Sequence, residues 1–538
     1  MDHLNHKYNF VLRASPFRWD LKKIFIGFLA LTVVLLISLP LVYLLVRALE
    51  SGEQGVEYLL RPRTITIFVN SIILTVIVVV ASGIIGLAFA WFTTRTTLPF
   101  KRVFLILGLL PMVIPSYIGS LTLIEFFGPV GILQKVLAPL GIQRLPEIYG
   151  LGGAAFAITL FTYPYFVLPL RAALLNMDQS LEEAAQSLGC SRQQIFWRII
   201  FPILRPSLAV GALLTALYTL SDFGAVMVMR YNAFSRAIYI AYESSFDRNR
   251  AAILALVLVA FTLFLTVLER RAGRSIRTYR IGKGTTRKAK PIDIGKWQFP
   301  AIIFLSIPIM LGVILPISIL FNWALNPVTS TIDMRLGEAS WNAGTSSAIT
   351  AMTCALMALP LVLLNRQFAS RASRGLMSLS YIGNALPGVA VGLALVFFGA
   401  NAFPNLYQTL PLLILGYAIR FLPYSLGSTQ TAFARINPAL EEVAQSLGAS
   451  SLRILWRITL PLAWTGITAG MGLVFLNTMK ELPTTLMLAP IGFVTPATRI
   501  WMASESAYLS LIGQPGLILI ALSCVGLIII LWRDAYVR

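Results

Sequence analysis

About twelve apolar blocks, each of the roughly 20 residues that a helix needs to cross a bilayer, divide this 538-residue chain. Because no water reaches the hydrocarbon core, a spanning segment must satisfy its own backbone hydrogen bonds as a helix. The chain is therefore predicted to be an all-α, polytopic membrane protein. The blocks lie at about 24–46, 67–92, 103–125, 151–174, 207–229, 251–268, 298–323, 346–364, 376–399, 409–428, 464–488 and 510–532.

The composition and the charge agree with this reading. Hydrophobic residues make up 57% of the chain and charged residues 12%, against roughly 25% charged in a soluble domain. The net charge of +21 does not indicate a nucleic-acid partner, because the basic residues lie beside the ends of the blocks, as membrane topology requires. Most of them fall in the N-terminal tail, in the link over 270–296 and in other even-numbered connections. Both termini are therefore predicted to be cytoplasmic.

A polar stretch occurs twice in this apolar chain. EEAAQSLGCSRQQIFWRIIFP, over 182–202, returns as EEVAQSLGASSLRILWRITLP over 441–461, with 13 identical positions and a constant offset of 259. An internal repeat of this length predicts two structurally similar halves. The same offset aligns the Pro-Tyr pair at Pro164 with the pair at Pro423.

Landmarks further upstream align at an offset of 272 instead. Asn70 matches Asn342 and Pro115 matches Pro387, so the first half carries about 13 extra residues, which we place in the 126–150 connection. We divide the chain into halves at 1–285 and 286–538, each with six spans. Halves with an even number of spans share one orientation, so they are predicted to be parallel repeats with a path between them.

Each copy of the motif follows the fourth span of its half, which predicts a short helix on the cytoplasmic face. Paired carboxylates at its start complement the helix dipole, a small alanine lets another surface approach, and a glycine ends the helix. A second helical stretch is predicted to end at Pro202 and Pro461. Membrane headgroups are an alternative partner for such a helix, but two matched copies favour a protein with two equivalent surfaces. The positions are Glu182, Glu183, Ala185, Gly189, Glu441, Glu442, Ala444 and Gly448.

At these residues the chain resembles the permeases of ABC importers, whose EAA loop it matches except at Val443. The resemblance implies two six-helix repeats of the type I importer fold and a cytoplasmic ATPase dimer docked on 182–202 and 441–461. It also implies a solute-binding protein that meets the loops around 230–250 and 489–507, and a bacterial inner membrane. The chain itself would be no enzyme and would hold no cofactor, because the partner uses the ATP.

Three short motifs resemble fused ferric-iron permeases in particular: YIGNALPG at Tyr381, RFLPY at Arg420 and KELP at Lys480. Similar fused permeases carry thiamine, and polyamine and sulfate permeases share the loop, so another small solute remains an alternative cargo. Proline is expected to bend the third and ninth spans at Pro111, Pro115 and Pro387.

Two carboxylates in the fifth spans are candidates for the translocation path. Asp222 and Glu481 differ by the repeat offset of 259, and a charge in a spanning segment costs roughly 2.5–3.5 kcal/mol. Hard oxygen ligands suit a trivalent cation, so both are expected to contact it transiently. The alternatives are that Glu481 pairs with Lys480 or Arg420 and that Asp222 caps a helix. Arg420 either neutralises Glu481 or meets an anionic, chelated substrate.

Other functional classes find less support in the sequence. The three cysteines and two histidines are scattered, so no resident metal site is assigned. The segment from Gly282 lacks the first glycine of a phosphate-binding loop. An ion-coupled secondary transporter would use Asp222 and Glu481 as its coupling pair, but would leave the two matched loops unexplained. A membrane-embedded enzyme lacks a nucleophile constellation.

Overall fold

The computed structural model describes residues 21–536 apart from 143, 244–247, 275–290, 327–333 and 369. The predicted boundary at 285/286, most of the basic link and the tail before residue 21 lie outside the described residues. The first half contains α1 (Leu21–Glu50), α2 (Gly52–Leu60), α3 (Pro62–Arg95), α4 (Lys101–Leu109), α5 (Ser116–Phe127), α6 (Ile132–Leu137), α7 (Leu151–Thr162), α8 (Pro164–Leu175), α9 (Gln179–Ser187), α10 (Arg192–Ile195), α11 (Phe201–Ser221), α12 (Gly224–Val228), α13 (Phe234–Glu243) and α14 (Arg248–Arg274). The second contains α15 (Gln298–Ile309), α16 (Leu315–Ala324), α17 (Met334–Gln367), α18 (Arg371–Ser380), α19 (Gly388–Ala402), α20 (Leu410–Ala434), α21 (Pro438–Ser446), α22 (Ser451–Ile454), α23 (Leu460–Met479), α24 (Pro483–Leu488), α25 (Pro496–Glu505) and α26 (Gly513–Tyr536).

The all-helical membrane fold is confirmed. Eleven helices in the described part are long and apolar enough to cross a membrane, or twelve if the pair 371–383 and 388–402 forms one bent span. The bend of 102° in that pair falls at Pro387. The third apolar block, predicted over 103–125, is not one span: α4 gives way to a 3₁₀ turn over Leu110–Met112, α5 starts only after Pro115, and the candidate span there runs over Ser116–Leu140. Proline lies at both interruptions.

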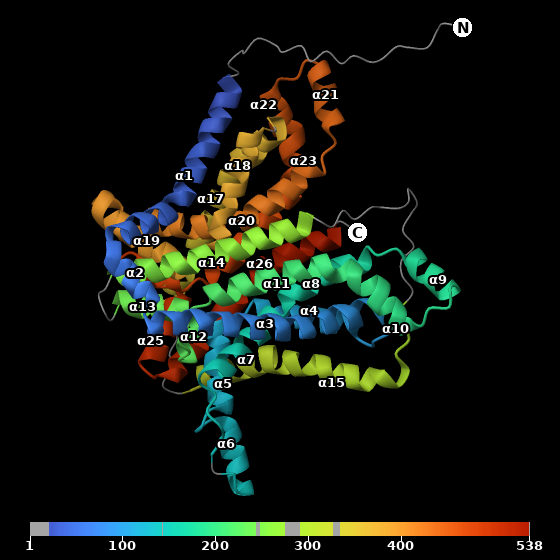
Figure 1. The fold of residues 1–538 in the computed structure, drawn as a ribbon, viewed down its shortest axis with the longest axis vertical. Helices are drawn as coiled ribbons and strands as arrows, with labels where there is room; N and C mark the ends of the chain where they lie inside the picture. The colour runs from blue at the N-terminus through green and yellow to red at the C-terminus, as the bar shows by residue number, and fades with distance from the viewer. Residues whose placement is uncertain are drawn as a thin grey trace.

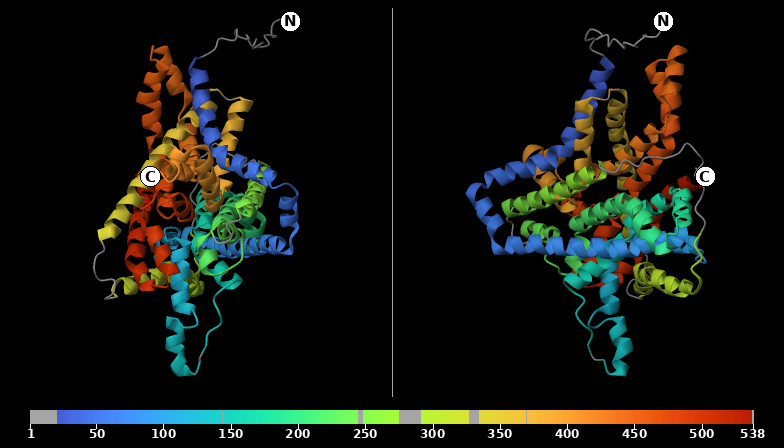
Figure 2. Two further views of the ribbon diagram at one scale, coloured as in Figure 1. Left: turned by 90° about the vertical axis from the view of Figure 1, so that its left-hand side faces the viewer. Right: turned by 45° about the vertical axis from the view of Figure 1, so that its right-hand side comes forward.

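Helix boundaries repeat between the halves with the two offsets found in the sequence. Adding 272 to the bounds of α3 gives those of α17, and adding 259 to those of α9 and α10 gives α21 and α22. The pair α7–α8 matches the single helix α20 in the same way. The extra residues of the first half include α6, which continues outward from α5 and projects from the rest of the molecule before the chain returns as a loop (Figure 2).

The first span of each half packs on the other half. Helix α1 contacts α17, α18 and α19, and Figure 1 shows it running beside α17 and α18. In the same way, α15 and α16 of the second half contact α4 and α5 of the first half. A cluster beneath the first half joins the two, with Tyr163 and Val167 packed against Ala301 and Leu305. The halves are therefore interlocked rather than placed side by side.

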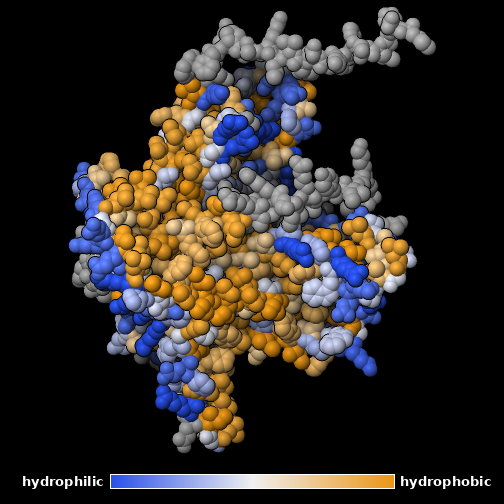
Figure 3. Space-filling model, in the orientation of Figure 1, coloured by the Kyte–Doolittle hydropathy of each residue, from blue (hydrophilic) through white to orange (hydrophobic). Residues whose placement is uncertain are grey.

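Apolar side chains cover much of the outer surface. Figure 3 shows them across the middle of one face, with hydrophilic residues gathered toward its edges. Large examples point outward from α1, α3 and α15, such as Phe25 at 64%, Ile84 at 61% and Phe299 at 70% exposed. A soluble chain rarely exposes so much contiguous apolar surface, and here it fits a lipid environment.

The fifth spans differ from the sequence prediction at both ends. The second helical stretch of each motif does not end at Pro202 or Pro461; it continues without a break into α11 or α23. A π-turn ends two residues before each proline, over Phe196–Ile200 and Leu455–Thr459. The wider turn tolerates a residue that lacks an N–H group and whose ring crowds the preceding turn. The helices then end at Ser221 and Met479, earlier than predicted.

Candidate functional site

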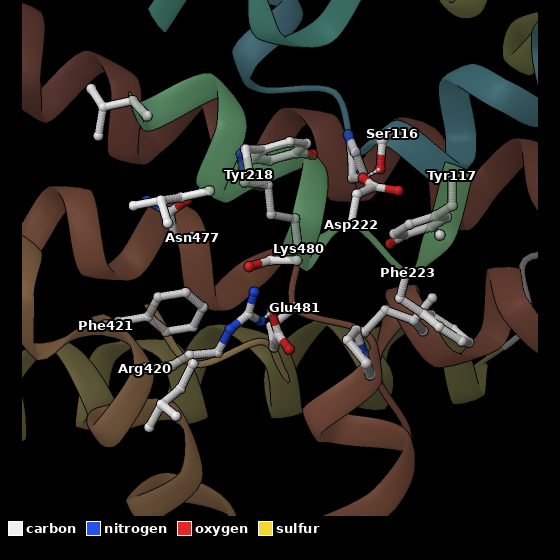
Figure 4. Close-up of a pocket in the computed structure, with 18 of the residues that line it drawn as sticks. Ser116, Tyr117, Tyr218, Asp222, Phe223, Arg420, Phe421, Asn477, Lys480 and Glu481 are labelled. Atoms are coloured by element: carbon white, nitrogen blue, oxygen red, sulfur yellow. Dashed lines mark hydrogen bonds and ion pairs between the residues drawn. The ribbon is translucent and has the colours of Figure 1, made fainter. Parts of the chain in front are cut away.

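A cavity of about 120 Å³ lies between the halves, next to the ends of α11 and α23 (Figure 4). Its walls contain several pairs of residues that the repeat superposes. Tyr165 faces it with Tyr424, and the predicted pair Asp222 and Glu481 both line it. The sequence offset therefore identified residues that border the same cavity. Four charged residues occur among those that line the cavity: Asp222, Arg420, Lys480 and Glu481.

Asp222 is the acidic group of the first-half wall. It follows the last residue of α11 and is 7% exposed. One carboxylate oxygen accepts a hydrogen bond from the Ala225 N–H at 2.8 Å, and the other accepts from the Ser116 hydroxyl. Asp222 thus caps the start of α12, the structural role considered for it, while its carboxylate also borders the cavity.

Glu481 has a different partner. Its carboxylate forms an ion pair with Arg420 from α20, and it also accepts from the Thr484 N–H and hydroxyl at 3.1 Å and 2.6 Å. Figure 4 shows Arg420 beside Glu481, away from Asp222 and Ser116. Arg420 therefore neutralises Glu481 in this conformation. Lys480 does not pair with Glu481; its ammonium donates to the Met112 carbonyl of the other half at 2.8 Å.

Sequence reasoning missed most of the neutral polar residues of the cavity. Tyr117 is 3% exposed, and no described residue is hydrogen-bonded to its hydroxyl. Tyr218 and Asn477 occupy positions that the 259 offset superposes, and both line the cavity. The offset could have found them, because it already paired Tyr165 with Tyr424. No comparable signal marks Tyr117, whose equivalent in the second half is Val389.

Aromatic residues close the cavity at the end of α11. The ring of Phe223 packs on Trp501 of the second half and on Tyr239, with ring centroids 5.1 Å and 4.7 Å apart. Beyond them, α13 and α25 end on matching acids, Glu243 and Glu505. Partial burial raises the pKa of Glu505, and the carboxylate of Glu243 raises it further.

The two motif loops form α9–α10 in the first half and α21–α22 in the second, and each follows directly on the fourth predicted span of its half (Figure 1). The glycines that end α9 and α21, Gly189 and Gly448, have φ of 79° and 82°, a left-handed conformation that favours glycine. The helices start earlier than the paired carboxylates, since Asp178 and Asn437 cap them.

The paired carboxylates of each loop point in different directions. Glu183 and Glu442 are exposed. Glu182 is 8% exposed and forms an ion pair with Arg95, the last residue of α3. Glu441 is half-buried and pairs in the same way with Arg366 near the end of α17, at 3.2 Å. The second carboxylate of each pair is therefore the more exposed one.

The small residues of the motif are also turned inward. Ala185 and Ala444, expected to let another surface approach, are 7% and 9% exposed. Ala185 packs in a cluster with Leu174, Met177 and Ile195 of its own half. Instead, matched leucines form the outward face of each loop: Leu181 and Leu188 in the first, Leu440 and Leu447 in the second. The exposed fractions of Leu188 and Leu447 reach 84% and 82%.

No cluster of three or more His, Cys, Asp or Glu side chains suited to a metal ion occurs in the described ranges. Any cation that enters the cavity would therefore meet a mixed set of carboxylate and neutral oxygen atoms. Acidic and basic side chains balance there, two against two.

The sequence model of one family matches both halves. The family is the binding-protein-dependent transport system inner membrane component, and the matches cover residues 82–278 and 356–538. Each match contains one motif loop and one of the cavity carboxylates.

Similar proteins include permeases of full length. The chain is 31% identical over 508 residues to the Fe(3+)-transport system permease protein FbpB 2 of Haemophilus influenzae, covering 92% of this chain and 94% of that protein. It is 26% identical to the ferric transport system permease protein FbpB of Actinobacillus pleuropneumoniae, over 89% of this chain and 73% of that protein. The sulfate transport system permease protein CysT of Escherichia coli is 28% identical but covers 47% of this chain.

Proposed function

This chain belongs to the family of binding-protein-dependent transport system inner membrane components, and we propose that it carries ferric iron across a bacterial inner membrane. It is a permease with many spans. In this proposal a cytoplasmic ATPase dimer docks on the two motif loops and supplies the energy. A solute-binding protein delivers the cargo to the opposite side, near α13 and α25. The termini and both loops are cytoplasmic.

The observation that carries the choice of cargo is the full-length match to a ferric permease. The relative named for Fe(3+) transport aligns with 92% of this chain, across both halves. The sulfate permease aligns with less than half of it. The alignment over both halves supports a cargo of the kind named for this relative.

The cavity chemistry supports the same cargo. Asp222 and Glu481 present carboxylate oxygens from opposite halves, and Tyr117, Tyr165 and Tyr424 add phenol groups. Oxygen donors are the ligands that hard cations prefer. A trivalent ion in water is strongly hydrated. A path that replaces its water ligands by several protein oxygen atoms lowers the free energy needed to dehydrate it. Arg420 and Lys480 give anions that accompany the metal a place to bind.

The exposed parts of the loops support the ATPase as the partner. Glu183 and Leu188 are exposed on the first loop, and the matched Glu442 and Leu447 are exposed on the second, so the two loops present equivalent exposed patches. Buried apolar anchors with a polar rim are the usual composition of a protein interface. A dimeric partner with two identical grooves fits two such patches.

The test is uptake by the chain reconstituted with its ATPase and binding protein in sealed vesicles. We expect radiolabelled ferric iron to accumulate only when ATP is present on the loop side, and labelled thiamine not to compete. Accumulation driven by an ion gradient without ATP would favour the secondary transporter instead. ATP-driven uptake of thiamine but not of iron would reject the cargo and leave the permease assignment in place.

A further inference from the structure

Two ion pairs connect the motif loops to helices that are distant in sequence. Arg95 at the end of α3 pairs with Glu182 on α9, 87 residues away. Arg366 near the end of α17 pairs with Glu441 on α21. The two arginines do not align under the offset of α3 and α17, which would place Arg95 opposite Gln367. Each half nevertheless provides an arginine that reaches the same carboxylate of its loop.

We propose that these two ion pairs are mechanical links, which pass the movement of each loop to the second span of its half. This inference rests on the proposed function, because it takes the loops as the place where the ATPase acts. Glu182 and Glu441 are positioning residues in this view, whereas Glu183 and Glu442 meet the partner.

The first link is sealed from solvent. The side chains of Arg95 and Glu182 are 3% and 11% exposed, and one guanidinium nitrogen donates to both carboxylate oxygens, to Oε2 at 2.6 Å. A buried charge pair is costly to separate, because each group would be left unpaired in a medium of low polarity. The loop and α3 must therefore move as one body as long as the pair holds.

Arg95 also connects the loop to the second half. Its backbone carbonyl accepts from the Ile292 N–H at 2.7 Å, and the Thr97 N–H donates to the Ile292 carbonyl at 3.0 Å. The Thr97 hydroxyl donates to Asp293 at 3.3 Å. This segment leads directly into α15, which packs on the first half. A displacement of the first loop is thus connected through one residue to the beginning of the other half.

The second link involves more groups but is less buried. The Arg366 guanidinium donates to the Phe433 carbonyl at 2.9 Å, in the last turn of α20, where a cation also complements the helix dipole. Glu441 accepts a further hydrogen bond from the Thr459 hydroxyl at 2.7 Å, in the π-turn before α23. The second pair therefore joins α17, α20, α21 and the start of the fifth span.

A role in transmission differs from a role in docking, and the two can be separated by measurement. A docking residue changes the affinity for the ATPase. A linking residue leaves the ATPase bound and hydrolysing ATP, but lowers the amount of cargo moved for each ATP. The coupling between two sites typically corresponds to a factor of about 5–150.

The experiment compares Glu182→Gln and Glu441→Gln in the full complex of permease, ATPase and binding protein. We expect both variants to co-purify with the ATPase as the unmodified chain does and to hydrolyse ATP. Ferric iron moved per ATP should fall about tenfold. The double exchange Arg95→Glu with Glu182→Arg should recover part of the loss, because it restores opposite charges at the same place.

Glu57→Gln is the matched control. Glu57 pairs with Arg61 at 3.0 Å at the other end of α3, where both side chains are largely exposed. This variant should keep the normal ratio of transport to ATP. If Glu182→Gln does not assemble with the ATPase, the transport-to-ATP ratio of the less buried variant Glu441→Gln tests the proposal.

An unchanged ratio in Glu441→Gln and in any assembled Glu182→Gln overturns the proposal. So does a loss of ATPase binding in step with transport, since the residues would then belong to the docking surface. The failure of the proposed function looks different: the unmodified chain would neither bind the ATPase nor transport iron with ATP.

Discussion

Gly388 occupies in the second half the position that Ser116 occupies in the first, each as the opening residue of a helix directly after a matched proline. Ser116 donates to Asp222. At Gly388 a Cβ atom would lie 2.6 Å from both the Arg420 guanidinium and the Glu481 carboxylate. The glycine therefore provides the room in which the second-half carboxylate can take an arginine as its partner.

Gly388→Ala is expected to destabilise the protein. The methyl group must displace the Arg420–Glu481 pair, and such overpacking costs about 1–3 kcal/mol. Gly375→Ala on α18 is the control: a Cβ there meets no atom within 4 Å, so alanine should stabilise the helix by roughly 0.5–1 kcal/mol. Thermal unfolding in detergent compares the two. Equal melting temperatures would contradict the steric account.

Asp222→Asn is expected to reduce iron uptake about tenfold, an activation difference of roughly 1.4 kcal/mol. The asparagine oxygen can still accept from Ala225, so α12 keeps its cap while the charge is lost. The measurement is the initial rate of iron uptake by vesicles that contain equal amounts of assembled complex. Normal uptake would leave Asp222 with the capping role alone.

Tyr117→Phe is expected to slow uptake without lowering stability. The hydroxyl is buried beside the cavity and has no hydrogen-bond partner among the described residues, so its removal breaks no internal contact. Tyr163→Phe is a matched control, because that hydroxyl is equally buried and unpartnered there but does not line the cavity. Uptake and melting temperature should be measured for both variants. A similar uptake rate in the two would show that the phenol of Tyr117 takes no part.

Leu188→Asp and Leu447→Asp are expected to release the ATPase. Both side chains are more than four-fifths exposed, so the folded permease should change in stability by only about 0.5 kcal/mol. An apolar anchor buried in an interface is worth about 2 kcal/mol or more. Co-purification with the ATPase measures the loss, and Leu140→Asp, at a leucine that is 75% exposed and lies outside the motif loops, serves as the control. Retained association would place the docking surface elsewhere.

The repeat made much of this architecture predictable. The two offsets predicted the matched boundaries of α3 with α17 and of α9 with α21. The offset of 259 also paired Asp222 with Glu481, and both residues line the same cavity. The sequence repeat is accompanied by a structural repeat, because matching helices of the two halves have matching bounds. The repeat could not predict contacts that occur in one half only, such as the hydrogen bond from Lys480 to the Met112 carbonyl.

Burial decided what the sequence left open in the loops. Glu182 and Glu183 are identical in type and adjacent, so no pattern distinguishes them. The helix turns neighbouring side chains by about 100°, and Arg95 lies on one side only. The ends of the fifth spans were misplaced for a related reason. A π-turn carries the helix past Pro202, where proline ordinarily indicates an end.

The exchange of first spans between the halves has a consequence for biosynthesis. Helix α1 is made first, yet α17, one of the helices on which it packs, emerges about 300 residues later, which at 5–20 residues per second is an interval of tens of seconds. During that time α1 can rest in the membrane only against lipid or the growing first half. The contacts of α1 with the second half can therefore form only after that half has been synthesised.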